Sequence, residues 1–69
     1  MNGVIVSVNV HRGYGFIRPD GERDNVFLHV SELAESIEWS ETLREMRVQF
    51  DVDVVDKGRR ARNVRQATR

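Results

Sequence analysis

Hydrophobic residues along the chain are grouped in short runs, and polar or glycine-containing turns separate these runs. β-branched residues dominate the first run, which begins after Gly3, and such residues favour strands over helices. The second run is apolar and aromatic and ends at the turn-forming triplet Pro19-Asp20-Gly21. The pattern as a whole predicts five short strands, at residues 4–10, 14–18, 25–30, 47–54 and 60–65.

Alternation within the last two predicted strands assigns their side chains to faces. In residues 47–54 the apolar side chains share one face of a half-buried strand, and this apolar set is Val48, Phe50, Val52 and Val54. In residues 60–65 the alternation places Ala61 and Asn63 on one side and Arg62 and Val64 on the other. The short polar connection after Pro19 predicts that the second and third strands form an antiparallel hairpin.

The segment between the third and fourth strands is mostly polar. Its first residues, Ser31-Glu32-Leu33, predict a brief helical turn capped by Ser31. Helical spacing of apolar residues predicts a short helix from about Ser40, within an extended loop from Ala34 to Met46. Five short strands without a long helix predict an all-β fold, and closing the strands into a five-stranded antiparallel barrel hides the edges that an open sheet exposes.

Length and composition restrict the class of protein. A chain of 69 residues, 39% hydrophobic and 32% charged, fits one soluble domain spanning residues 1–69. Without cysteine, neither disulfides nor a cysteine-bound metal stabilises the fold. No apolar stretch approaches the roughly 20 residues of a membrane span, and the amino end lacks the pattern of a secretion signal. We therefore expect a cytoplasmic monomer without a membrane partner, a metal or a small-molecule cofactor.

Charge is distributed unevenly along the chain, although the formal net charge is zero. Residues 20–56 contain all eleven acidic residues and three basic ones, whereas residues 57–69 contain six basic residues and no acidic one. A phosphate backbone responds to the local surface as well as to the total charge. Net neutrality therefore does not exclude a nucleic-acid partner, although a solvated basic end without a partner is the alternative.

The second and third strands each carry an aromatic side and an aliphatic side, because side chains two apart share a face. Tyr14 and Phe16 project together, and Phe27 projects with His29. If the aliphatic residues fill the core, the four rings lie on the outer surface; these aliphatic residues are Ile17, Val26, Leu28 and Val30. The reverse assignment would point Arg12 and Arg18 into the core, because both share parity with Tyr14 and Phe16.

Exposed rings of this kind suit unpaired bases, since stacking on an aromatic side chain contributes roughly 1–3 kcal/mol per base. Arg12 lies at the edge of the rings, where it can meet a phosphate or a base. Trp39 either extends the stacking surface or covers one end of the barrel. A catalytic or metal-binding role for His29 lacks the partners that such a site needs, so we expect a binding protein rather than an enzyme.

The two aromatic runs resemble the two ribonucleoprotein motifs of the cold-shock domain, here Arg12-Gly13-Tyr14-Gly15-Phe16-Ile17 and Val26-Phe27-Leu28-His29. The resemblance spans nearly the whole chain and includes Asn9 before the first motif. It implies a five-stranded OB-type barrel that binds single-stranded DNA or RNA with weak sequence preference, often as an RNA chaperone. Carried over by position, the resemblance implies that nucleic acid is bound by Asn9, Arg12, Tyr14, Phe16, Phe27, His29 and Lys57. We add Trp39 to this set.

The chain departs from the family pattern at three positions. Val6 and Ser7 stand where the family usually has lysine and tryptophan, and Val30 stands where an aromatic commonly follows the motif histidine. Two stacking positions and one charge are therefore missing. We expect weaker and more charge-dependent binding than the motifs alone imply, with Trp39 and the arginine-rich end as hypothetical compensation.

Three alternatives to this interpretation differ in how much of the predicted fold and function they keep. An RNA-recognition motif needs two amphipathic helices that the chain lacks, so it is set aside. The segment Leu28 to Leu33 is also similar to the OB repeat of ribosomal RNA-binding proteins, which keeps the fold and the ligand class. The alternative from another class is a protein-interaction module on a barrel that has lost most of its nucleic-acid affinity.

Overall fold

Five strands and two single turns of 3-10 helix make up most of the computed structural model, which describes residues 1–56 and 58–67. The strands are β1 (Asn2–Asn9), β2 (Tyr14–Pro19), β3 (Val26–His29), β4 (Arg47–Val55) and β5 (Gly58–Gln66). The helical turns η1 (Val30–Glu32) and η2 (Glu41–Leu43) both lie between β3 and β4. The expected five strands and two helical turns are therefore present, with ends that differ by one or two residues from the predicted ones.

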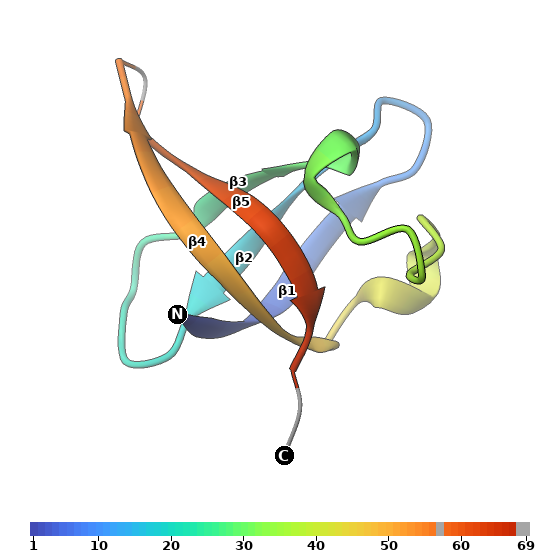
Figure 1. The fold of residues 1–69 in the computed structure, drawn as a ribbon, viewed down its shortest axis with the longest axis horizontal. Coiled ribbons are helices and arrows are strands. Elements are labelled where there is room, and N and C mark those ends of the chain that lie inside the picture. Colours follow the sequence, from blue (N-terminus) through green and yellow to red (C-terminus); the bar gives the residue numbers. More distant parts are fainter. Residues whose placement is uncertain (57, 68–69) are drawn as a thin grey trace.

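The strands close into a barrel in the order β1-β2-β3-β5-β4 (Figure 1). Four of the five neighbouring pairs are antiparallel, and β3 pairs with β5 in parallel through Phe27 and Arg60. The prediction of an all-β barrel is confirmed. The closing seam departs from the antiparallel pattern, because β5 runs in the same direction as β3.

The barrel interior is filled by side chains from all five strands and by one residue of η2. Phe50 is the largest of them and is fully buried. The described core consists of Ile5, Ile17, Val26, Leu28, Leu43, Val48, Phe50, Ala61 and Val64. Because the inward residues of β2 and β3 are aliphatic, the aromatic residues of these strands lie on the outside.

Strict alternation fails in β5 at Asn63. Its backbone is left-handed (φ 53°), and the register of β4 and β5 shifts between Gln49 and Asp51. A bulge adds one residue to a strand, so the residues after it change sides. Ala61 and Val64 are therefore both buried while Asn63 is exposed, which corrects the predicted grouping of Ala61 with Asn63.

The apolar face of β4 ends before the strand does. Val48 and Phe50 are buried and Val52 is half-buried, but Val54 is 79% exposed. The β4–β5 hairpin extends past the rest of the barrel at this point, so alternation continues where no core remains to be covered (Figure 1). The prediction that Val54 belongs to the core face is wrong for this reason.

The segment from Leu33 to Met46 covers one end of the barrel. Leu43 is buried in the core, and four half-buried residues pack against it, namely Leu33, Ile37, Trp39 and Met46. Backbone hydrogen bonds tie the end of the segment to β1, from Ile5 N to Met46 O (3.0 Å) and from Glu45 N to Ile5 O (2.7 Å). The segment therefore covers the core as a lid, and its 3-10 turn η2 is shorter than the helix expected from about Ser40.

The cap of η1 is His29, not Ser31. The Nδ1 atom of His29 accepts a hydrogen bond from Ser31 N (3.1 Å), and the strand ends at His29. Val30 consequently belongs to η1 and is only half-buried, which corrects its predicted place beside Leu28 in the core.

No helix in the described part of the chain is long and apolar enough to cross a membrane.

Two substitutions in β4 distinguish the observed core from the predicted face. Phe50→Ala should lower the free energy of unfolding by about 3–5 kcal/mol, because it leaves a cavity at the centre of the barrel. Val54→Ala should change it by less than about 0.5 kcal/mol, because the side chain is already in water. Urea denaturation followed by circular dichroism measures both, and equal losses would contradict this description of the core.

Candidate nucleic-acid interface

Three aromatic rings from β2 and β3 contact one another on the outer wall of the barrel. The centroids of Tyr14 and Phe27 are 5.9 Å apart with an angle of 25° between the planes, a stacked arrangement. Phe16 lies edge-on to both, at 6.4 Å from Tyr14 and 5.9 Å from Phe27. All three rings are half-buried, whereas the aliphatic neighbours on the same strands are fully buried. The predicted outward face of these two strands is confirmed.

The strand register arranges these outward residues in two parallel rows. Phe27 is opposite Phe16, Phe16 is opposite Ser7, and Arg60 continues the row on the other side of Phe27. Residues that face each other across neighbouring strands project on the same side of a sheet. The first row therefore runs from Ser7 through both phenylalanines to Arg60.

The second row consists of Asn9, Tyr14 and His29, which are opposite one another on β1, β2 and β3. Nδ1 of His29 accepts from the backbone N–H of Ser31 and lies 2.9 Å from Oγ of the same residue. An acceptor at Nδ1 places the proton of the neutral imidazole on Nε2. The ring is thus held in one orientation, and Nε2–H is left to donate to a ligand.

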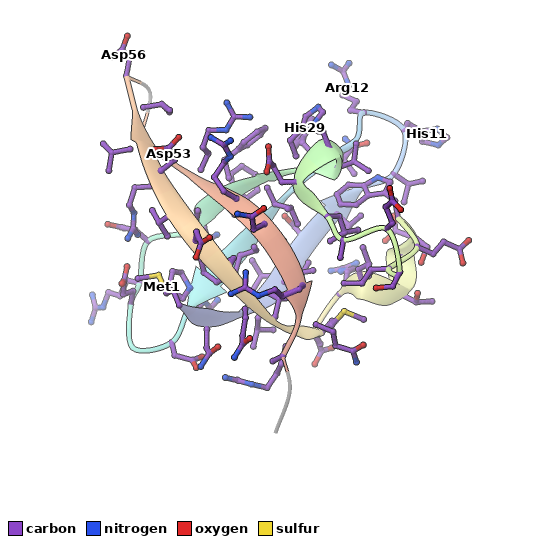
Figure 2. All side chains as sticks on the ribbon, viewed as in Figure 1. Met1, His11, Arg12, His29, Asp53 and Asp56 are labelled. Atoms are coloured by element: carbon purple, nitrogen blue, oxygen red, sulfur yellow. The ribbon has the colours of Figure 1, made fainter. Side chains whose placement is uncertain are left out.

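The turn between β1 and β2 positions Arg12 beside the second row. Oδ1 of Asn9 accepts from Arg12 N (3.1 Å), and the carbonyl of Asn9 accepts from Gly13 N (2.9 Å). Gly13 is left-handed (φ 75°), a conformation that glycine adopts without strain. Figure 2 shows Arg12 and His29 at the same end of the barrel, with His11 further along the turn. Asn9 thus holds the turn and fixes the backbone of Arg12.

Gly15 separates the two outward rings of β2 and brings β1 close behind them. It is buried opposite Val8, and a Cβ at this position would collide with the carbonyl oxygen of Ser7. Any side chain here would push β1 away from β2. The close approach of the two backbones, rather than space for the rings, is therefore the reason that this position requires glycine.

Two of the three departures from the family pattern, Ser7 and Val30, lie next to residues of the two motifs. Ser7 is directly opposite Phe16, so a small hydroxyl side chain stands beside that ring on β1. Val30 packs against the turn, where its Cγ1 would lie 3.1 Å from a Cβ on Gly13. The aromatic surface is therefore narrow, consisting of Tyr14, Phe16 and Phe27 with the His29 ring beside them.

Two arginines of the arginine-rich end, Arg59 and Arg62, are paired with carboxylates. Nη1 of Arg59 lies 2.8 Å from Glu22, and Arg62 contacts both Asp53 (2.9 Å) and Glu32 (3.3 Å). Surface pairs of this kind contribute about 0–1 kcal/mol to stability, but they place a negative charge beside each positive one. The sequence count of positive charges therefore overstates the positive surface that a phosphate would meet.

The two remaining predicted site residues are Trp39 and Lys57. Trp39 is half-buried against the core in the segment that covers the barrel end, and its buried Nε1–H finds no acceptor among the described residues. Lys57 lies outside the described residues. Sequence reasoning missed Asn25 and Arg60, which line a pocket beside Phe16 and Phe27, because only the β3–β5 pairing brings Arg60 next to Phe27.

Within residues 1–56 and 58–67, no group of three histidine, aspartate or glutamate side chains is placed to hold a metal ion.

The sequence model of the "Cold-shock" DNA-binding domain matches residues 1–67. The chain belongs to this family. Its relatives include the cold shock-like protein CspG of Escherichia coli strain K12, which is 31% identical over 64 residues that cover 93% of this chain and 90% of CspG. The cold shock-like protein CspA of Stigmatella aurantiaca is 38% identical over 64 residues, covering 91% of each protein.

A solved structure described as drosophila Unr CSD456 shares the fold of this cold-shock domain. The TM-score is 0.77 at 24% sequence identity, and the match covers 97% of this chain. The chain corresponds to only 26% of the length of that structure. At this identity the likeness establishes the five-stranded barrel alone.

Gly15→Ala tests whether the rings depend on the close approach of β1. We expect the added methyl group to force the strands apart at Ser7, to lower the free energy of unfolding by about 1–3 kcal/mol and to disorder the rings. Chemical denaturation measures the stability, and nuclear magnetic resonance shifts of the Tyr14 and Phe16 rings report the surface. Gly21→Ala is the control for a loss of stability without a collision: its left-handed backbone (φ 78°) disfavours alanine, but a Cβ there meets nothing within 4 Å, so the ring signals should not move. An unchanged ring spectrum in Gly15→Ala would contradict the role assigned to Gly15.

Proposed function

We propose that this cold-shock domain binds single-stranded RNA or DNA by stacking unpaired bases on Tyr14, Phe16, Phe27 and His29, and that its low sequence specificity suits an RNA chaperone or a regulator of gene expression. The observation that carries the proposal is the cluster of three touching rings on the outer wall. Such a cluster leaves apolar area in water, and a stacked base removes that area from water. Family membership supports the same ligand class.

The rings would bind only unpaired strands, because the faces of the bases in a duplex are covered by neighbouring base pairs. Binding two or three neighbouring bases would therefore shift a folded RNA towards its unpaired form, by preferential binding to that state. Arg12 lies at the end of the rings with its backbone N–H fixed by Asn9. It would contact the phosphate between two stacked bases.

Charge would contribute less to this binding than the arginine-rich sequence suggests. An ion-paired arginine that turns to a phosphate leaves its carboxylate facing the same phosphate, so the net gain is small. Arg59 and Arg62 are both paired in this way. Stacking would therefore supply most of the affinity, in place of the more charge-dependent binding expected from the sequence.

Several finer features of the proposal follow from the family rather than from the site. A cytoplasmic location, a monomeric state and a single domain spanning residues 1–69 fit a small cold-shock protein. Direct contacts from Asn9, Lys57 and Trp39 to the strand remain predictions. The buried indole of Trp39 favours a structural role for that side chain.

Removing a ring should weaken binding in proportion to the stacking it supplies. Phe16→Ala and Phe27→Ala should each raise the Kd for a labelled heptamer of deoxythymidine or uridine roughly five- to 150-fold. Phe27→Tyr keeps a ring of nearly the same shape and should bind within about twofold of the wild type. Fluorescence anisotropy at 20 mM salt provides the measurement. A wild type that fails to bind either strand there would reject the proposal and favour the protein-interaction module.

The salt dependence of the same binding separates stacking from phosphate contacts. With one or two unpaired basic contacts, the logarithm of affinity should fall with the logarithm of salt with a slope of about −0.7 to −1.4 for a single strand. Arg12→Ala should reduce the steepness by about 0.7, whereas Arg62→Ala should leave it nearly unchanged. A slope steeper than about −3 in the wild type would contradict the small charge contribution proposed here.

A further inference from the structure

A pocket of about 450 Å³ opens beside the aromatic rings, between the beginning of β3 and the β4–β5 hairpin. Phe16 and Phe27 form one side of it, and Val55 from the hairpin lines another. This volume falls within the range of about 300–1,000 Å³ that is typical of ligand sites. Because the same two phenylalanines belong to the ring cluster, the pocket is continuous with the proposed stacking surface.

Three polar side chains complete the pocket, namely Asn25, Arg59 and Arg60. Arg59 is committed to the protein, since it binds Glu22 and also donates from Nη2 to the carbonyl of Asp24 (3.3 Å). It therefore braces the pocket against the loop between β2 and β3. A ligand would find its guanidinium already occupied.

Arg60 is not committed in this way. Among the described residues it enters no ion pair, and its Nε is buried without an acceptor. Its register partner on β4, Asp53, instead binds Arg62 at 2.9 Å. An arginine that is half-buried and lacks an acceptor is costly unless a ligand supplies one. The pocket thus contains a cationic donor whose hydrogen bonds the described chain does not use.

The position of Arg60 relates it to a base rather than to the phosphate backbone. Arg60 is the parallel register partner of Phe27, so the two side chains are neighbours on the outer wall. A base that stacks on the face of Phe27 keeps its edge in the plane beside that ring. The guanidinium is therefore placed at the edge of the base.

The donor pattern of arginine selects among the bases. Its planar fork matches two adjacent acceptors, and guanine offers such a pair in O6 and N7. Thymine and uracil have a donor between their two carbonyls, and adenine places an amino group beside N7, so neither accepts both arms. Cytosine offers O2 and N3, but its single ring covers less of Phe27 than a purine does.

We propose that the pocket of Phe16, Phe27, Asn25 and Arg60 binds one guanine of the bound strand, with the Arg60 guanidinium donating to O6 and N7. This inference rests on the proposed single-strand binding and adds a base preference at one position of an otherwise tolerant surface. Arg60 acts here as a specificity-determining residue. Asn25 supplies an amide at the mouth of the pocket, where it accepts from or donates to the same base.

The experiment places a single deoxyguanosine at each position of a deoxythymidine heptamer in turn and measures the Kd by fluorescence anisotropy. One of these strands should bind about tenfold or more tightly than the all-thymidine strand. At that position the Arg60 guanidinium can donate to both O6 and N7 of guanine, whereas thymine cannot accept both hydrogen bonds. 7-Deazaguanosine at that position removes only N7 and should abolish most of the gain. A single deoxycytidine should give no comparable gain at any position.

Variants assign the preference to Arg60. Arg60→Gln should lose the guanosine gain, measured within the variant as the ratio of the Kd for the all-thymidine strand to the Kd for the guanosine strand. Arg44→Gln removes the same charge from an exposed residue beyond η2 and should keep the gain. Equal affinities for all single-base strands, a cytidine preference, or a gain that survives in Arg60→Gln would each overturn the inference. Tight binding of the all-thymidine strand in those cases would leave the proposed function intact.

Discussion

The interior of the barrel is filled by aliphatic side chains around Phe50, and this packing leaves no room inside for further rings. Ile17, Val26 and Leu28 occupy the inward positions of β2 and β3, so Tyr14, Phe16 and Phe27 must face outward. The surface that would bind a strand is thus a consequence of how the core is packed. A change that loosens the core also moves the rings, since both sets of side chains project from the same short strands.

The outward rings are supported from behind by backbone rather than by side chains. At Gly15 the carbonyl of Ser7 occupies the space that a Cβ would need, which fixes the separation of β1 and β2 beneath the aromatic residues. At the end of the same hairpin, Asn9 closes the turn and fixes the backbone of Arg12. Stacking surfaces that are held rigid before binding lose less entropy when a ligand orders them.

Local patterns in the sequence were sufficient for the strands and for the faces of β2 and β3, because the two-residue period of a strand is a local property. They were insufficient wherever a partner strand decides the geometry. The bulge at Asn63 depends on the register with β4, and it reverses the side to which Val64 points. Val54 follows the alternation, yet it lies beyond the core that would have covered it. Arg59 and Arg62 count as positive charges in the sequence, and only the fold shows which carboxylates face them.

The seam between β3 and β5 has a further consequence for how the barrel opens. Three consecutive strands form one half of the wall and the β4–β5 hairpin forms the other, and this seam rests on the parallel pair Phe27–Arg60 and a bridge from Leu33 to Val64. The long stretch of chain between β3 and β5 makes its closure entropically costly. A ligand that contacts both Phe27 and Arg60 would therefore link the two halves of the wall. It would slow the separation of β3 from β5 as well as occupy the surface.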